Sequence, residues 1–349
     1  MNSELIGDKV ILSGEGASEL YNIGYYGRPR GDTLELSLTE ASYLFEREKI
    51  NICLNQNSLD FEEFFKISSI RMENFELKYL VYKDLKERGY YVQPSSTDFR
   101  LYPRGIRPGE APAEYFVHVI SERKPLSLTE LTFFMETAEN VRKGILLAVV
   151  DEESEITFYV VKRMMMKGGM NPVDNFKGSG TLLEDRVVIF DSKLAKSLYN
   201  NGFFGKLLEG RLQLSLVESA YLLKKKIIKI VDRSGNLLSL KKFTGTATKI
   251  EPTFRMKLNI YEDMRNNRMV VKTGFKFGSH FRVYKEIESM KSHLPHSEYL
   301  VHTIPDDHVF LLPEMSRAIR LAQSVRKQMI FAYIKDKKAQ YIDIGRAKP

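Results

Sequence analysis

The sequence contains one cysteine, Cys53, among 349 residues. A single cysteine cannot form an internal disulfide, and it excludes the zinc sites that need several cysteine ligands. A chain of this length can bury a sizeable core without such cross-links and has room for roughly two to four small domains.

Long hydrophobic runs are also absent. The best one, Ile145 to Val150, is far shorter than the roughly 20 residues of a membrane helix. The segment Met1 to Val10 has no basic part followed by an apolar part, so we expect no export signal and a cytoplasmic location. With 43% hydrophobic and 28% charged residues, the composition is typical of a folded globular protein.

Basic residues outnumber acidic ones, 53 to 45, which gives a net charge of +8 and a pI of about 9.2. This balance favours polyanionic partners, because each contact with a phosphate releases condensed counterions. Charge alone is a weak signal, since many basic proteins bind no nucleic acid.

The chain contains an internal repeat. Tyr21–Gly27 returns as Tyr199–Gly205, and the match continues without a gap from Leu34–Leu38 to Leu212–Leu216. Three more matches follow in the same order: Asp98–Tyr102 with His280–Tyr284, Glu114–His118 with Glu298–His302, and Val141–Lys143 with Val325–Lys327. Ordered matches in this number indicate a tandem duplication. The period, about 180 residues, is too long for a solenoid, so each copy should fold as a unit.

Each copy divides again, which predicts a mixed α/β fold with an N-terminal α+β subdomain and a C-terminal α/β subdomain per repeat. The Met- and Gly-rich seam Met164–Asn175 has the composition of a linker. The expected boundaries are 1–75 and 76–165 for the first repeat, 166–178 for the linker, and 179–255 and 256–349 for the second repeat.

Local patterns predict the elements of the second repeat. Ser215 and Glu218 form a capping box before a helix, and Gly and Thr residues indicate a turn. The expected helices are Leu214–Lys226, Tyr261–Asn267 and Glu314–Lys327, the turn is Phe243–Thr248, and the strands are Met269–Thr273, Phe281–Tyr284, Tyr299–Ile304, Met329–Ile334 and Tyr341–Ile344. The last strand is expected to be exposed and able to pair across an interface.

The second repeat carries four strings in a specific order: Val271–Gly278, Phe281–Tyr284, His296–Val301 and Ser324–Lys327. Together they resemble the C-terminal domain of archaeal tRNA-splicing endonucleases, and the resemblance covers essentially the whole chain. A chain of two full repeats is similar to the homodimeric type, in which two chains present four repeat units. The resemblance implies a nuclease-like C-terminal subdomain in each repeat.

This resemblance implies cleavage of precursor tRNA at the borders of its intron, within a bulge-helix-bulge element. The products would carry 2′,3′-cyclic phosphate and 5′-hydroxyl ends, and neither metal nor cofactor is expected. By position in the motifs, the catalytic residues would be Tyr284, His296 and Lys327.

These three residue types suit such chemistry. Attack by the 2′-hydroxyl of the RNA needs a base, an acid for the leaving oxygen and positive charge near the phosphorane. We assign these roles to Tyr284, His296 and Lys327, respectively. A tyrosine with an ordinary pKa of about 10 is a poor base at neutral pH, and a nearby lysine could lower that pKa.

Two arginines join the site by resemblance, since the family holds a flipped-out bulge base between arginines at these places. They are Arg320 and Arg346. Arg320 precedes Lys327 by seven residues, so both should lie on one side of a helix that includes them.

The first repeat keeps the scaffold and loses the chemistry, so 76–165 is expected to be a degenerate, structural subdomain and 256–349 the catalytic one. Tyr102 and Lys143 survive, but Pro112 stands at the position of His296 and Glu136 at that of Arg320. A proline cannot donate a proton, and a glutamate repels RNA.

The first repeat also has an acidic turn, Asp151 to Glu155, where the second repeat has the basic turn Lys335–Gln340. In the family an acidic loop at this place docks into a basic cleft of a neighbouring unit. The expected dimer contacts are therefore Asp151, Glu152, Glu153 and Glu155, although a plain polar hairpin turn is the alternative.

Other interpretations remain open. The same fold could serve as a non-catalytic RNA-binding or scaffold subunit, or as a metal-dependent DNA nuclease, although the carboxylate cluster of the latter is missing. A metal site at His293, His302 and His308 is not expected, because no carboxylate or cysteine stands at ligand spacing. Phe275 and Phe277 are expected to pack inside the protein rather than stack on bases.

Overall fold

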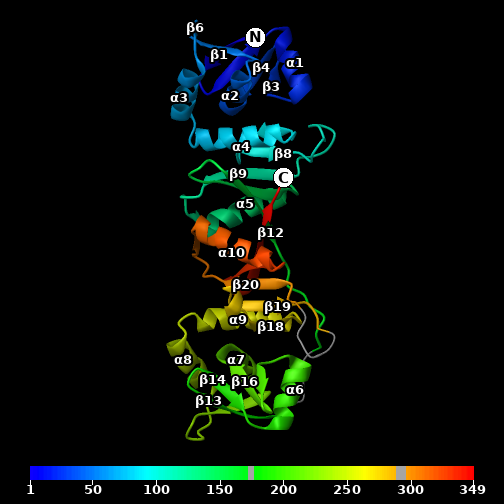
Figure 1. Cartoon of the computed structure of the whole chain (residues 1–349), viewed down its shortest axis with the longest axis vertical. Helices are drawn as coiled ribbons and strands as arrows, with labels where there is room; N and C mark the ends of the chain where they lie inside the picture. Colours follow the sequence, from blue (N-terminus) through cyan, green and yellow to red (C-terminus); the bar gives the residue numbers. More distant parts are fainter. Residues whose placement is uncertain (172–176, 288–295) are drawn as a thin grey trace. The chain divides into compact units, whose positions relative to one another are not determined.

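The computed structural model describes residues 1–171, 177–287 and 296–349 (Figure 1). The chain forms two compact units. Unit 1 comprises Met1–Lys162, Val309–Glu314 and Gly345–Pro349, and unit 2 comprises Arg163–His308 and Met315–Ile344. Part of the expected linker, residues 172–176, and His293 lie outside the described residues.

Unit 1 begins with a six-stranded sheet in the order β3-β4-β2-β1-β5-β6 (Figure 1). Its strands are β1 (Asn2–Ile6), β2 (Lys9–Ser13), β3 (Arg28–Arg30), β4 (Thr33–Ser37), β5 (Asn51–Leu54) and β6 (Asn57–Ser58). The helices of this part are α1 (Glu15–Gly24), α2 (Leu38–Glu46) and α3 (Phe61–Arg71).

Unit 2 begins with the same arrangement, since its first sheet has the order β15-β16-β14-β13-β17. The elements are β13 (Gly178–Leu183), β14 (Arg186–Ile189), α6 (Ser192–Gly202), β15 (Lys206–Leu208), β16 (Arg211–Ser215), α7 (Leu216–Lys224), β17 (Ile228–Val231) and α8 (Leu240–Ile250). Strand for strand, this order repeats β3-β4-β2-β1-β5. The tandem duplication and the mixed α/β class are thereby confirmed.

A buried glutamate holds the same turn in both copies. Glu218 completes the expected capping box with Ser215 at the start of α7 and also accepts a hydrogen bond from the Gly205 amide at 2.8 Å. Glu40 makes the equivalent bond to Gly27, also at 2.8 Å. The sequence match around these residues therefore reflects one shared device that fixes the turn after the first helix.

The C-terminal part of each repeat begins with a helix, followed by a mixed sheet. In unit 1 these elements are α4 (Phe75–Glu87), β7 (Val92–Pro94), β8 (Phe99–Leu101), β9 (Tyr115–Ser121), β10 (Leu126–Ser127), α5 (Leu128–Asn140), β11 (Gly144–Val150) and β12 (Ile156–Arg163), with sheet order β7-β8-β9-β11-β12. Strands β9 and β11 are parallel and are joined through α5.

The second repeat has the sheet order β18-β19-β20-β22-β23, with the parallel pair β20 and β22 joined through α10. The elements are α9 (Phe254–Asn266), β18 (Val270–Thr273), η1 (Phe275–Phe277), β19 (Phe281–Tyr284), β20 (Tyr299–Thr303), β21 (Val309–Phe310), α10 (Leu312–Ser324), β22 (Gln328–Lys335) and β23 (Lys338–Ala347). The short strand β21 belongs to unit 1, where it pairs with β10.

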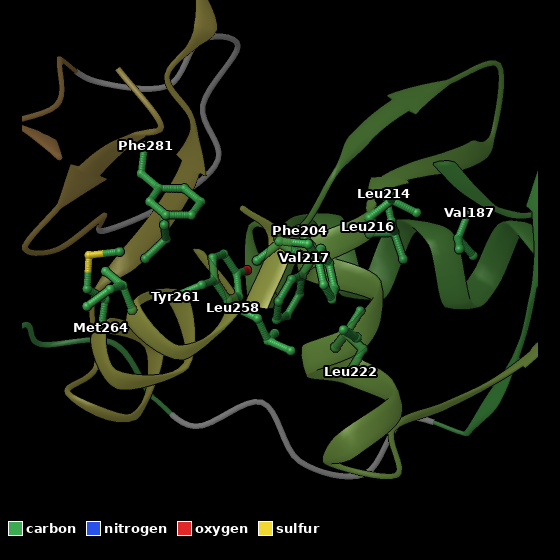
Figure 2. Close-up of a cluster of buried hydrophobic side chains, with 14 of the residues drawn as sticks. Val187, Phe204, Leu214, Leu216, Val217, Leu222, Leu258, Tyr261, Met264 and Phe281 are labelled. Atoms are coloured by element: carbon green, nitrogen blue, oxygen red, sulfur yellow. The ribbon is translucent and has the colours of Figure 1, made fainter. Parts of the chain in front are cut away.

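One hydrophobic core joins the two halves of the second repeat. Figure 2 shows Phe204 and Val217 from the first half beside Tyr261, with Phe281 of β19 beyond it. Phe204 is fully buried and Tyr261 is 1% exposed. Burying a large apolar side chain stabilises a fold by about 1.5–3 kcal/mol, so this shared core fixes the first half against the sheet that carries Tyr284.

The predicted turn at Phe243–Thr248 is wrong, because these residues lie inside helix α8. Ser239 caps the helix by accepting a hydrogen bond from the Lys242 amide. The threonine hydroxyls bond back to carbonyls three or four residues earlier, and Phe243 and Ala247 are buried. The cap and the buried face outweigh the low helix propensity of Gly and Thr.

The predicted helix Glu314–Lys327 is wrong at its end. Helix α10 stops at Ser324, and Arg326 takes a left-handed conformation with φ 56° before β22 begins. Lys327 therefore lies outside the helix, and the expectation that Arg320 and Lys327 share one helix face fails.

The other predicted elements are present, with shifted bounds. Helix α7 begins at Leu216 instead of Leu214, and α9 begins at Phe254 instead of Tyr261. The hairpin turn between β22 and β23 consists of Asp336 and Lys337, both with positive φ, so it is shorter than expected. Residues Tyr341–Ile344 are buried rather than exposed, so they offer no free strand surface for an interface.

Within residues 1–171, 177–287 and 296–349, none of the helices is both long and apolar enough to cross a membrane.

Candidate active site

Three neighbouring strands place three side chains in one row. Val283 of β19 pairs with Tyr299 of β20, and Tyr299 pairs with Gln328 of β22. Tyr284, Glu298 and Lys327 are each the next residue along the chain from one of these paired residues, on the same side, so they are neighbours across the sheet. The sheet register thus brings together residues that are 43 positions apart in the sequence, from Tyr284 to Lys327.

Tyr284 ends β19 and is 1% exposed. Burial raises the pKa of its phenol above the ordinary value; the Arg282 guanidinium opposes this shift and the Glu298 carboxylate adds to it. The sequence left open whether a nearby lysine lowers this pKa, and the structure shows the opposite direction. Since this pKa is raised above its ordinary value, Tyr284 holds its proton at neutral pH in the free protein.

Lys327 stands just before β22 and is 7% exposed. Its Nζ donates a hydrogen bond to the Ser297 carbonyl oxygen at 2.7 Å and lies 5.6 Å from the centre of the Phe277 ring. Burial lowers the pKa of the Lys327 ammonium, Arg282 adds to this lowering, and Glu298 opposes it. The ammonium is thus fixed in position by protein contacts.

His296 directly precedes Ser297, the residue that anchors Lys327, and its side chain is exposed. Its ring makes no hydrogen bond to the part of the chain that the structure describes. A histidine next in sequence to the residue that anchors the Lys327 ammonium, with its ring open to solvent, is accessible to a bound substrate.

The first repeat reproduces this frame without the histidine. Tyr115 pairs with both Leu101 and Gly144, so Tyr102 and Lys143 form a row in the first repeat that is equivalent to the row of Tyr284 and Lys327 in the second. Lys143 Nζ donates to the Ala113 carbonyl at 3.0 Å, the counterpart of the Lys327 bond. Since Ala113 corresponds to Ser297, Pro112 stands at the place of His296.

The Tyr102 hydroxyl donates to Gln93 Oε1 at 2.8 Å. The hydroxyl of the first-repeat tyrosine is therefore engaged by a side chain of the neighbouring strand β7. The two repeats share this scaffold and differ in the residue beside the lysine anchor, His296 in one and Pro112 in the other.

Sequence models of one family match both repeats. The model described as the tRNA intron endonuclease, catalytic C-terminal domain, matches residues 75–158 and 254–341. The model of the N-terminal domain of the same endonuclease matches residues 1–65 and 178–244. The chain belongs to the tRNA intron endonuclease family.

Relatives from archaea extend over the full length. The tRNA-splicing endonuclease of Methanosarcina mazei is 53% identical over 350 residues, covering 100% of this chain and 99% of the relative. Those of Methanococcoides burtonii and Halobacterium salinarum are 52% and 33% identical, each with 100% of both chains covered. As a member of this family, the chain is an enzyme, a tRNA-intron lyase, and both of its repeats carry the fold of the family's catalytic domain.

The two arginines expected to hold a bulge base stand in different units. Arg320 is exposed on α10 in unit 2, and Arg346 is exposed on β23 in the part of that strand that belongs to unit 1. Their action on one base stays a prediction.

The acidic turn between β11 and β12 is exposed and ordered by its own side chains. Asp151 Oδ1 accepts hydrogen bonds from the Glu153 and Glu155 amides at 3.0 and 2.8 Å. Glu152 forms an ion pair with Arg123. The carboxylates of Glu153 and Glu155 thus project from a fixed turn, and docking into a partner stays a prediction.

Two histidines near the site form a structural pair. The rings of His280 and His302 stack with centroids 4.2 Å apart, and His280 Nδ1 accepts a hydrogen bond from the Thr303 amide at 2.9 Å. Burial lowers the pKa of His280 to about 3, and the nearby His302 and Lys257 add to the shift. Among the described residues, no group of three or more His, Cys, Asp or Glu could hold a metal ion.

Sequence reasoning missed Arg282. This side chain precedes Tyr284 by two residues on β19, so it lies on the same face of the sheet, and its charge acts on both Tyr284 and Lys327. The sequence does contain a signal for this arginine, because the string Phe-Arg-x-Tyr occurs in both repeats, at Phe99–Tyr102 and Phe281–Tyr284.

Proposed function

We propose that this enzyme excises introns from precursor tRNA by cutting at bulge-helix-bulge elements, and that each chain contributes one active site, formed by Tyr284, His296 and Lys327. The observation that carries the proposal is the row of Tyr284, Glu298 and Lys327, with His296 beside the anchor of the lysine. The same row in the first repeat has Pro112 in place of the histidine.

The three side chains supply what 2′-hydroxyl attack requires. Tyr284 takes the proton of the RNA 2′-hydroxyl, His296 gives a proton to the leaving 5′-oxygen, and Lys327 stabilises the charge on the phosphorane. The nucleophile belongs to the substrate, so the products are a 2′,3′-cyclic phosphate and a 5′-hydroxyl. This set of groups completes the reaction without a metal ion or cofactor.

Tyr284 can accept the 2′-hydroxyl proton only as a phenolate, and its raised pKa makes loss of the phenol proton the difficult step. Positive charge helps here, because the Arg282 guanidinium favours the phenolate and thereby opposes the effect of burial. Lys327 is held close to the sheet by Ser297, so it is in place before the substrate arrives. Such preorganisation removes the cost of arranging the charge during the reaction.

We further propose that the enzyme acts as a homodimer. Excising an intron needs two cuts, and one competent site per chain supplies two in a dimer. The acidic residues Asp151, Glu152, Glu153 and Glu155 provide a negatively charged surface for contact with a basic part of the second copy. In this proposal the dimer contains four repeat units, and each unit is divided into subdomains at the boundaries given above.

The test uses a precursor tRNA with a single 2′-deoxy nucleotide at one of the two splice sites, in excess EDTA. We expect normal cutting at the unmodified site, no cutting at the modified one, and cyclic phosphate ends on the product. Cutting at the 2′-deoxy site, or 5′-phosphate ends, contradicts the proposed chemistry. RNA binding without cutting at either site instead favours the non-catalytic RNA-binding subunit.

A further inference from the structure

A cleft of about 650 Å³ opens beside η1 in unit 2. It is lined on one side by the hairpin of β15 and β16 and on the other by β18, η1 and β19. The volume lies within the roughly 300–1,000 Å³ typical of small-ligand sites. Phe277, which lines the cleft, also lies with its ring centre 5.6 Å from the Lys327 ammonium, so this ring stands between the cleft and the row of Tyr284, Glu298 and Lys327.

Phe275 is displayed to solvent at this cleft. Its side chain is 91% exposed, so the expectation that it packs inside the protein is wrong. The turn that carries it is fixed: the Phe277 amide donates to the Gly274 carbonyl at 2.8 Å, and Gly278 takes φ 62°. A side chain at Gly274 would come within 2.4 Å of Ser279 Oγ. The aromatic ring is therefore held outward by a tight turn.

The cleft wall carries positive charge that is not used within the described chain. Lys206 and Lys276 are exposed and form no ion pair with the described residues. The two carboxylates at the cleft are already engaged: Asp185 pairs with Arg186 at 2.7 Å, and Glu218 bonds to Gly205 and Ser215. The surplus charge at the cleft is therefore positive and suits a phosphate.

Arg282 adds a donor without a partner. Its Nε is buried, and nothing in the described residues accepts a hydrogen bond from it. A buried polar group left in this state is unusual and calls for an explanation such as a ligand. The same side chain lies two residues before Tyr284, so a phosphate bound to Arg282 is close to the proposed site of cleavage.

The first repeat supplies a comparison. It keeps an arginine, Arg100, at the position of Arg282, but the η1 turn is replaced by Gln93–Thr97, which contains no aromatic residue. The exposed ring is thus present only in the repeat that has His296. This pattern links the ring to catalysis rather than to folding.

We propose that this cleft binds one unpaired nucleotide of the RNA strand beside the cut, with its base stacked on Phe275 and its phosphate held by Arg282. The inference rests on the proposed function, because it names a part of the same substrate. Stacking accepts any base, so the cleft selects a nucleotide that is unpaired rather than one of a given identity. Lys206 and Lys276 attract the strand electrostatically.

The test places 2-aminopurine at each unpaired position beside the cut, in a precursor tRNA made uncleavable by a 2′-deoxy nucleotide. Its fluorescence reports stacking. We compare the wild type with Phe275→Leu, which removes the aromatic face, with Phe275→Tyr, which keeps it, and with Phe190→Leu as control. Phe190 is also exposed, at 55%, but does not line the cleft. Since Phe275 is almost fully exposed, its replacement should leave the melting temperature unchanged.

We expect one position to be quenched by the wild type, by Phe275→Tyr and by Phe190→Leu, and not by Phe275→Leu. The dissociation constant of Phe275→Leu should rise between about 5-fold and about 150-fold. An abasic nucleotide at that position should weaken the wild type by a similar factor and leave Phe275→Leu unchanged. A methylphosphonate beside it should weaken the wild type more than Arg282→Gln.

The inference is overturned if quenching persists in Phe275→Leu. It is also overturned if the abasic nucleotide lowers the RNA affinity of the wild type and of Phe275→Leu equally. The uncleavable substrate makes this readout independent of turnover. If the wild type cuts precursor tRNA while Phe275→Leu binds and cuts equally well, the nucleotide site fails and the proposed function stands. A wild-type protein that binds no precursor tRNA contradicts both the nucleotide site and the proposed function.

Discussion

The Lys327 ammonium donates a hydrogen bond to the Ser297 carbonyl oxygen at 2.7 Å, and Lys143 makes the corresponding bond to Ala113 at 3.0 Å. The two lysines are matched in sheet position and in anchoring. They differ in the residue next to the anchor, which is His296 in one repeat and Pro112 in the other. The duplication thus provides a matched internal control for two of the proposed catalytic residues, Tyr102 for Tyr284 and Lys143 for Lys327.

Replacing Lys327 by methionine should lower the single-turnover cleavage rate about 100- to 1,000-fold, the usual cost of removing one charge-stabilising donor. Lys143→Met should leave the rate unchanged, although it loses the equivalent hydrogen bond. Measuring both rates with saturating enzyme and the same precursor tRNA decides the matter. Equal losses in the two variants would mean that the lysines serve the fold alone.

The cleavage rate should rise with pH above neutrality. Because the pKa of Tyr284 is raised, its phenolate is scarce at pH 7 and becomes more abundant as the pH increases. The lowered pKa of Lys327 should end this rise when its ammonium loses its proton. Tyr284→Phe should abolish the rising limb, and Tyr102→Phe should keep it. A wild-type rate that stays flat above pH 7 excludes Tyr284 as the base.

Unit 2 should lose stability in acid through the stacked pair His280 and His302. Both folded-state pKa values are lowered, that of His280 to about 3, so folding favours the neutral rings. This stabilising contribution is fully present above the unfolded pKa of about 6.5 and is lost as the pH falls from there towards 3.

The first repeat suggests the variant that tests this effect. There, Asp98 faces His118 in an ion pair at 3.2 Å, at the position where the second repeat has His280. His280→Asp should therefore weaken the fall in melting temperature between about pH 6.5 and pH 4.5. A wild-type melting temperature that does not change across this range contradicts the prediction.

Reversing the charge of the acidic turn, with Asp151, Glu152, Glu153 and Glu155 all changed to lysine, should split the dimer and reduce cleavage. The physical reason is the loss of attraction to a basic surface, so the wild-type dimer should also weaken at high salt. Sedimentation velocity measures the assembly. As control, Asp306→Lys combined with Asp307→Lys changes an exposed acidic turn of the second repeat and should leave the dimer intact. An intact dimer in the first variant contradicts the proposal that the acidic turn docks onto the second copy.

Arg320→Ala and Arg346→Ala should reduce cleavage of a bulged substrate more than they reduce affinity for fully paired RNA. Stacking of a base on a guanidinium contributes about 1–3 kcal/mol, so a loss of about 5- to 150-fold is expected for the bulge. Arg317→Ala, an exposed arginine one turn earlier on α10, serves as the control. Equal losses on both RNAs indicate a general electrostatic role.

Local signals in the sequence were sufficient for much of the fold. The capping box of Ser215 and Glu218 and the aromatic and β-branched content of Phe281–Tyr284 are local features, and both elements are present. The helix α8 was missed because its Gly and Thr residues conceal a start that Ser239 provides. The end of α10 depends on the left-handed conformation of Arg326, which no composition rule specifies.

The candidate site could be named from the sequence only by resemblance, and its geometry could not be derived. The row of Tyr284, Glu298 and Lys327 arises from strand register across β19, β20 and β22, which links distant segments. The exposure of Phe275 depends on the tight turn, and the lack of an acceptor for the Arg282 Nε among the described residues depends on packing. Such properties appear only once the sheet and the cleft are assembled.

Cleavage of an intron-containing precursor tRNA in excess EDTA, with wild type compared with His296→Ala, tests the central claim most directly. The account predicts that the wild type releases the intron and that His296→Ala binds the RNA with wild-type affinity but does not cut it. Near-normal cleavage by His296→Ala would show that the second repeat does not use this histidine as its acid, and would contradict the account.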